Sequence, residues 1–170
     1  MSKKAGLLLS PHHSLLSTQS SSLTLMATSR RQAREFALQI LYQVDMSGVE
    51  PYRALALFWQ NFEPRAETQE FTTELVEGAW GERERLDKLI ADAAEHWRLG
   101  RLPKVDLNLL RLAAYELLSY PQLTPGVTIN EAIEIARLYC GDEAPMFMNG
   151  VLDRIAEITG KKAQTNESSK

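Results

Sequence analysis

Apolar residues recur along most of this chain with the 3.6-residue period of an amphipathic α-helix. In the first predicted helix, residues 30–46, one apolar arc is formed by Ala33, Phe36, Ala37, Ile40, Leu41 and Val44. Ser47-Gly48 ends it, and Pro51 suits the first position of a second helix that stops before Pro64. The face of that second helix is rich in aromatic residues: Tyr52, Leu55, Phe58, Trp59 and Phe62.

The longest periodic stretch runs from Phe71 to Trp97 without a phase slip. It predicts one long helix, or two collinear ones, although Gly78 and Gly81 each cost about 1 kcal/mol of helix stability relative to alanine. Close packing against a neighbouring helix would explain both glycines.

Three further helices follow. Residues 104–120 are apolar almost all round, which predicts a central, buried helix. Thr128 and Glu131 have the spacing of a capping box at the start of the next helix, which Gly141 ends after a face containing Tyr139 and Cys140. The last helix covers about 145–159, with Gly160 as its stop and an inward face of Phe147, Met148, Val151, Leu152, Ile155 and Ile158.

Sustained period-two alternation is absent, so no strand is predicted. The sequence therefore predicts an all-α, single-domain bundle of about seven helices over residues 28–160. The polar tail, residues 161–170, is expected to be disordered.

Residues 1–27 form a Ser-rich leader that we also expect to be disordered. Pro11 and the two histidines after it break the apolar core that a secretory signal needs, and the absence of arginine before residue 30 argues against an organellar transit peptide. A third interpretation is that Met26 is the true start and that the upstream stretch is a mis-assigned extension.

Composition narrows the classes of function. A net charge of −3 over 170 residues argues against a protein that coats nucleic acid by charge alone, so any such binding must be local or shared with a basic partner. A single cysteine, Cys140, excludes an internal disulfide and a cysteine-based zinc site, and it fits a reducing cytoplasm as a buried core thiol. No apolar run approaches the roughly 18 residues that a membrane span needs.

Arg30, Arg31 and Arg34 gather on one flank of the first helix, within its first turns. Cations are disfavoured at a helix N-terminus, so this placement suggests an anionic ligand. The alternative is that the arginines simply solvate a surface helix.

No motif indicates catalysis or a resident metal or cofactor. His96 lies alone at a predicted helix end, and no nucleotide-binding loop or nucleophile elbow occurs. The sequence is therefore that of a binding module rather than an enzyme.

Four blocks, in this order, resemble the NusB family of bacterial transcription antitermination factors: RRQAREFALQILYQVD, VDLNLLRLAAYELL, INEAIEIAR and FMNGVLDRI. The resemblance covers about 28–160. It implies an all-helical cytoplasmic protein that binds the single-stranded boxA segment of nascent ribosomal RNA transcripts. It also implies a joint action with NusE, the small-subunit ribosomal protein, in a complex that keeps RNA polymerase elongating.

The resemblance also implies site residues. Arg30, Arg31 and Arg34 match the family's RNA-contacting helix, and arginines hold single-stranded RNA through phosphate contacts and stacking. Phe147 can stack a base or pack in the core, and Asn149 can read a base edge.

On the protein side, Asp106 matches an acid that can pair with a basic residue of NusE, or it can simply stabilise the helix dipole. Gly126 stands where a lysine is frequent in the family, so the role of its loop in RNA binding is open. The role of Glu143, in the loop before the last helix, is also open. The competing hypothesis is a protein-interaction module, such as a homodimer that buries its basic helix.

Overall fold

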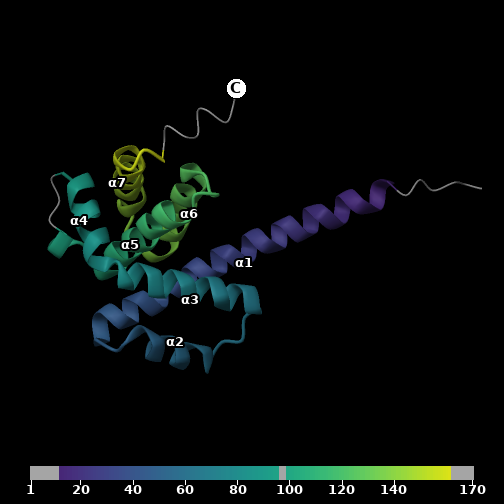
Figure 1. Cartoon of the computed structure of the whole chain (residues 1–170), viewed down its shortest axis with the longest axis horizontal. Helices are drawn as coiled ribbons and strands as arrows, with labels where there is room; N and C mark the ends of the chain where they lie inside the picture. Colours follow the sequence, from purple (N-terminus) through teal and green to yellow (C-terminus); the bar gives the residue numbers. More distant parts are fainter. Residues whose placement is uncertain (1–11, 96–98, 162–170) are drawn as a thin grey trace, which may run out of the picture.

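The computed structural model describes residues 12–95 and 99–161, with side chains from residue 28 onward. Within these ranges the chain forms seven α-helices and one short 3₁₀-helix, and it contains no strand. The all-α prediction is confirmed (Figure 1). The helices are α1 (His12–Ser47), α2 (Pro51–Trp59), α3 (Ala66–Gly81), α4 (Arg83–Ala93), η1 (Leu99–Arg101), α5 (Lys104–Ser119), α6 (Pro125–Tyr139) and α7 (Ala144–Ile158).

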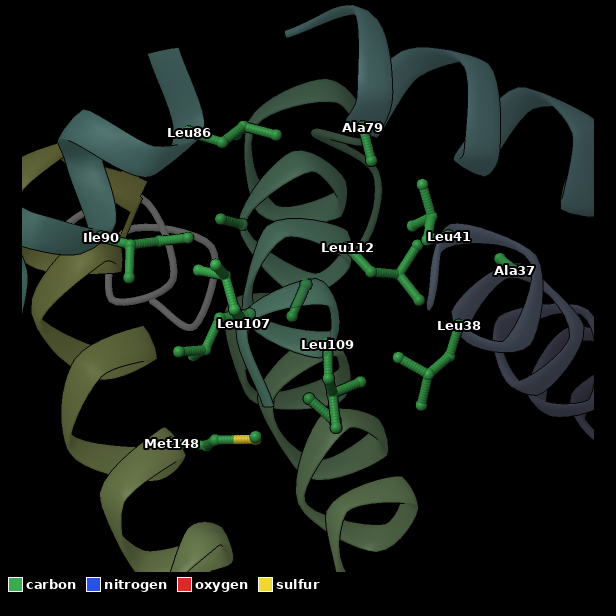
Figure 2. Packing of buried hydrophobic residues seen from close by; sticks show 14 of the residues in the cluster. Ala37, Leu38, Leu41, Ala79, Leu86, Ile90, Leu107, Leu109, Leu112 and Met148 are labelled. Atoms are coloured by element: carbon green, nitrogen blue, oxygen red, sulfur yellow. The ribbon is translucent and has the colours of Figure 1, made fainter. Parts of the chain in front are cut away.

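Helix α5 is the centre of the fold, as its nearly continuous apolar sequence predicts. It packs against α1, α3, α4, α6 and α7. Its leucines meet side chains from the surrounding helices, among them Leu41 of α1, Ile90 of α4 and Met148 of α7 (Figure 2). Burial of this apolar surface, at about 25 cal/mol per Å², is the main force that holds the other helices around α5.

Helix α1 begins earlier than expected. It extends back to His12, and its N-terminal part projects away from the other helices (Figure 1). The first helix therefore does not start at the expected residue 30, whereas the expected disorder of residues 1–27 stays a prediction. No glycine or proline occurs within residues 12–47, so nothing in the sequence stops the helix from extending N-terminally beyond residue 30. Residues 1–11 and 162–170 lie outside the described residues, and the start at Met26 stays a prediction.

The long stretch after Phe71 is two helices rather than one. Glu82 leaves helical geometry, with φ −98° and ψ 10°, and separates α3 from α4. Helix α3 then packs mainly on α1, whereas α4 packs on α5 and α7. A Cβ at Gly78 would collide with the ring of Tyr115, which confirms close packing there. At Gly81 the space is open, so the same prediction is wrong for Gly81.

Several predicted helix ends also differ. Helix α2 ends at Trp59, although Phe62 beyond it still stacks on Phe58, with ring centroids 4.5 Å apart. Helix α6 begins at Pro125, with Thr124 as its N-cap, because proline at the first position starts the helix one turn earlier than the expected capping box. The last predicted stop is correct, since Gly160 adopts φ +70°. The exposed side chain of Ile158, however, does not face inward.

None of the helices among the described residues is both long and apolar enough to cross a membrane.

Candidate functional site

The three arginines of the first helix lie in different surroundings. Arg34 is buried, with 5% of its surface exposed. Its Nε and Nη2 donate to the two carboxylate oxygens of Glu116, at 2.8 and 2.6 Å. The hydroxyl of Thr128 donates to the same carboxylate at 3.1 Å. Arg34 therefore joins α1 to α5 and α6 inside the domain, and its guanidinium is not placed to touch a ligand from solvent.

Arg31 makes a second bidentate pair closer to the surface. Its Nε and Nη2 donate to Glu131 of α6, at 2.9 and 2.7 Å. The hydrogen bonds of this pair lower the pKa of the Glu131 carboxyl and raise the pKa of the Arg31 guanidinium, against the effect of burial. The Arg31 side chain keeps 41% of its surface exposed, so it can reach a ligand from solvent.

Arg30 is exposed and lies over an aromatic ring. Its guanidinium carbon is 5.3 Å from the centroid of Phe71, within the range of a cation–π contact. Next to it is a shallow cleft of about 270 Å³, lined by Ser29, Arg30, Glu67, Glu70, Phe71, Glu74 and Tyr120. The hydroxyl of Tyr120 donates to Glu74 at 2.9 Å. Burial, followed by this bond, raises the pKa of Tyr120, so the phenol stays protonated.

Phe147 and Asp106 line one apolar groove. The groove has a volume of about 820 Å³ and lies between the C-terminal end of α4, the start of α5 and the start of α7. Asp106 is buried, and its Oδ1 atom has no hydrogen-bond partner. Buried polar atoms are normally paired, so this oxygen is an exception within the described part of the chain.

Cys140 is half-buried beside this carboxylate. Burial, and then its hydrogen bond to Asp106, raise the pKa of the Cys140 thiol to about 12. A thiol with this pKa is protonated at neutral pH, which disfavours a nucleophilic role.

Asn149 opens onto a different hollow. It is exposed, and its Nδ2 donates weakly to Asp153 at 3.4 Å. The hollow has a volume of about 500 Å³ and also includes Arg137 of α6 and Met146 of α7. Met146 lines the Asp106 groove as well, so the two hollows lie on either side of the first turn of α7.

The acidic partners of the arginines are not among the predicted site residues. Glu116 is detectable in principle, because a carboxylate within the apolar sequence of α5 needs a buried partner. Glu131 binds Arg31 rather than forming the predicted capping box. Among the described residues, no group of three or more histidines, cysteines or acids is arranged to hold a metal ion.

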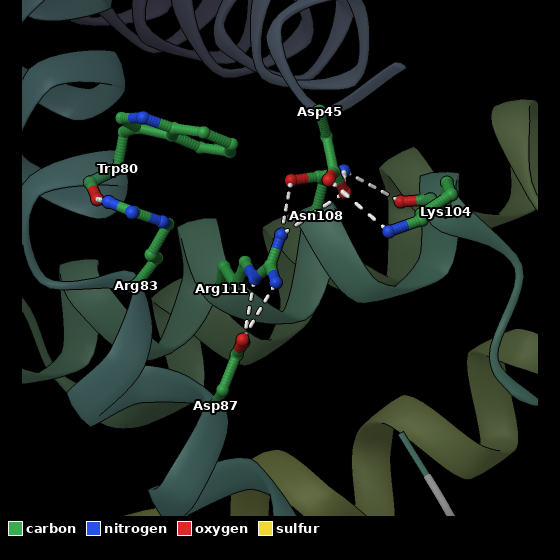
Figure 3. Close-up of polar contacts among 7 residues, drawn as sticks. All are labelled: Asp45, Trp80, Arg83, Asp87, Lys104, Asn108 and Arg111. Carbon is green, nitrogen blue, oxygen red and sulfur yellow. Dashed lines mark hydrogen bonds and ion pairs between the residues drawn. The ribbon is translucent and has the colours of Figure 1, made fainter. Parts of the chain in front are cut away.

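A second polar cluster lies along the N-terminal half of α5 (Figure 3). Arg111 donates two hydrogen bonds to Asp87 of α4, at 2.6 and 2.7 Å. It also pairs with Asp45 of α1, at 3.2 Å. Asn108 and Lys104 donate to the same Asp45 carboxylate. This cluster ties three helices together and contains no residue of the predicted site.

Comparison with known proteins gives consistent results. The model of the NusB family matches residues 31–157. A transcription antitermination protein NusB from Desulfatibacillum aliphaticivorans is 42% identical over 138 residues, which are 81% of this chain and 96% of the relative. The NusB structure from T. maritima has a TM-score of 0.68 and 34% identity, and the match covers 75% of this chain and 90% of that one.

A further structural neighbour is a crystal structure of the antitermination factors NusB and NusE in complex with double-stranded RNA. It has a TM-score of 0.68 and 28% identity, and the match covers 77% of this chain and 98% of that chain.

Proposed function

This chain belongs to the NusB family of transcription antitermination factors, and we propose that it binds boxA RNA of nascent ribosomal RNA transcripts together with NusE. The complex would promote processive elongation by RNA polymerase in the cytoplasm. The proposal rests on one observation above all: two successive arginines of the family-like first helix, Arg30 and Arg31, both reach solvent.

In this proposal the arginines divide into two roles. Arg30 and Arg31 contact RNA phosphates directly, because their guanidinium groups are accessible. Arg34 is a positioning residue: its buried pair with Glu116 fixes the part of α1 that presents the other two. The ring of Phe71, which Arg30 now covers, is a stacking surface for a base.

The last helix contributes a second contact region. Asn149 is exposed at the start of α7 and can hydrogen-bond a base edge. Phe147 lies in the apolar groove and packs partly against the core. Its proposed stacking role therefore requires a base to enter the groove.

The groove is also the site we propose for NusE. An apolar groove with a buried carboxylate, one oxygen of which lacks a hydrogen-bond partner, suits a protein segment that carries a lysine or arginine. The lysine or arginine of NusE would pair with Asp106, and NusE would add the positive charge that this acidic chain lacks.

Fluorescence anisotropy with labelled single-stranded boxA-type RNA tests the RNA site. We expect Arg30→Ala and Arg31→Ala each to weaken binding several-fold and to flatten the slope of log K against log salt by about 0.7, the loss of about one phosphate contact. Arg85→Ala is the matched control, because Arg85 is an exposed arginine of α4 that pairs with Glu82 of the preceding turn.

Two further measurements complete the test. Addition of the cognate NusE should tighten RNA binding by the wild-type protein, and an unlabelled duplex of the same sequence should compete poorly if the site takes single strands. Unchanged affinity in both arginine variants, together with no synergy with NusE, would overturn the proposal.

A further inference from the structure

Two arginines of the proposed RNA site are matched by two carboxylates within the folded protein. Arg31 and Arg34 come from α1, whereas their partners Glu116 and Glu131 come from α5 and α6. Four formal charges therefore cancel within and beneath the surface that the sequence predicts to be basic. Glu35 and Glu134 add further negative potential at Arg31.

The two pairs differ in how easily they can open. The side chains of Arg34 and Glu116 are 6% and 1% exposed, and separating them would leave a buried charge without a partner. The pair of Arg31 and Glu131 reaches solvent, where an ion pair contributes little net stability. The surface pair alone is therefore able to exchange partners.

Glu131 also has a second cation within reach. Its Oε2 atom lies 3.5 Å from Nη1 of Arg34, in addition to its bonds with Arg31. If Arg31 turns outward, the carboxylate keeps a positive neighbour and is not left unpaired. The exchange therefore avoids most of the cost of stranding a half-buried charge.

We infer that in the free protein the Glu131 carboxylate binds the Arg31 guanidinium in the way that an RNA phosphate would. RNA must therefore displace Glu131 from Arg31 in order to bind. Carboxylate and phosphate both accept two parallel hydrogen bonds from a guanidinium group, which makes one a substitute for the other. This inference rests on the proposed RNA-binding function. It makes Glu131 a brake on the affinity of the free chain for RNA.

The decisive variant is Glu131→Gln, which keeps the shape of the side chain and removes its charge. In the anisotropy assay with labelled single-stranded boxA-type RNA, we expect about fivefold tighter binding. The slope of log K against log salt should stay close to that of the wild type, because Arg31 contacts one phosphate in both complexes. The gain should vanish when Arg31→Ala is added, because it depends on that guanidinium.

The matched control is Glu134→Gln, on the same helix, where Glu134 pairs with Arg137 instead. It removes the same charge close by without freeing the Arg31 fork. An equal gain from Glu134→Gln would overturn the inference in favour of general electrostatics. Weaker binding by Glu131→Gln would also overturn it, since Glu131 would then orient Arg31 for RNA rather than compete for it.

The result is separable from the proposed function. If Arg31→Ala weakens RNA binding while Glu131→Gln leaves it unchanged, only the brake is wrong. If neither Arg30→Ala nor Arg31→Ala has an effect, the RNA site itself is wrong. Circular dichroism checks folding, and if Glu131→Gln does not fold, Glu131→Asp replaces it. The shorter side chain breaks the bidentate pair with Arg31, so RNA binding at least twofold tighter than that of the wild type is expected. Unchanged binding by Glu131→Asp would count against the inference.

Discussion

At the scale of single residues, Gly78 and Gly81 make opposite predictions although they are three positions apart in α3. A methyl group at Gly78 would collide with the ring of Tyr115, so Gly78→Ala should lower the free energy of unfolding by about 1–3 kcal/mol. Gly81 has open space around its Cα and no positive φ. Gly81→Ala should therefore raise the free energy of unfolding by about 0.5–1 kcal/mol.

Urea denaturation at neutral pH measures both changes with one method. The double variant Gly78→Ala with Tyr115→Leu tests the mechanism, because a smaller residue at 115 makes room for the methyl group. A Gly78→Ala variant more stable than the wild type would show that Tyr115 rotates away at no cost, and that helix propensity alone decides the outcome.

The same two glycines show what residue spacing cannot reveal. Periodicity places both in a helix, yet only the neighbouring helix decides which of them is in contact. The arginines repeat this lesson: Arg31 and Arg34 share one flank of α1, and only the position of Glu116 in α5 buries one of them. A helical wheel gives the direction of a side chain but not the partner that waits there.

At the scale of elements, the existence of each helix could be predicted, while several ends and junctions could not. The apolar period runs on from α3 into α4, but the two helices have different neighbours, and the chain breaks at Glu82 to reach both. At α6, the proline at position 125 starts the helix, which leaves Thr128 and Glu131 free to bind α5 and α1. Two residues with the spacing of a capping box therefore make tertiary contacts instead.

Arg111 yields a prediction at this scale, because it joins α5 to α1 and α4 (Figure 3). Arg111→Met should lower the free energy of unfolding at pH 7 by about 2–4 kcal/mol, since removing one partner leaves carboxylates that are partly buried without compensation. Arg154→Met is the control: Arg154 is half-exposed, and its loss should change stability by less than about 0.5 kcal/mol.

The effect of Arg111→Met should depend on pH. Burial opposes the charged form of Asp45, but hydrogen bonds from Asn108 and Lys104, and the charge of Arg111, lower its pKa below the usual 3.8. The folded carboxyl therefore contributes stability above that value, which is lost as pH falls through the lower folded pKa. Guanidinium denaturation at pH 7 and near pH 3 should show a smaller difference between variant and wild type in acid. A difference that grows in acid would mean that the cluster is not held by charge.

At the scale of the whole molecule, an acidic chain presents a groove in which one carboxylate oxygen lacks a partner. Close to that groove, the side chain of Met146 is 81% exposed on the first turn of α7. Exposed apolar surface beside a buried carboxylate oxygen without a partner is more typical of an interface than of a solvated face. The sequence predicted a role for Asp106 in partner binding, but it could not place the acid and Phe147 in one groove, because they lie 41 positions apart on different helices.

The occupant of this groove is therefore the molecule-scale prediction. If it is NusE, Asp106→Asn should weaken the affinity for NusE about tenfold, because a charged hydrogen bond of about 1.5 kcal/mol is lost. RNA binding by the chain alone should not change. Asp142→Asn, an exposed acid at the rim of the groove, is the control and should have little effect. Isothermal titration with NusE measures the change in NusE affinity.

The alternative occupant is a second copy of this chain, which light scattering of the free chain tests. If the free chain is a dimer, if Asp106→Asn dissociates that dimer, and if NusE affinity is unchanged, the groove belongs to a homodimer interface. Asp106 Oδ1 would then accept its hydrogen bond from the second copy.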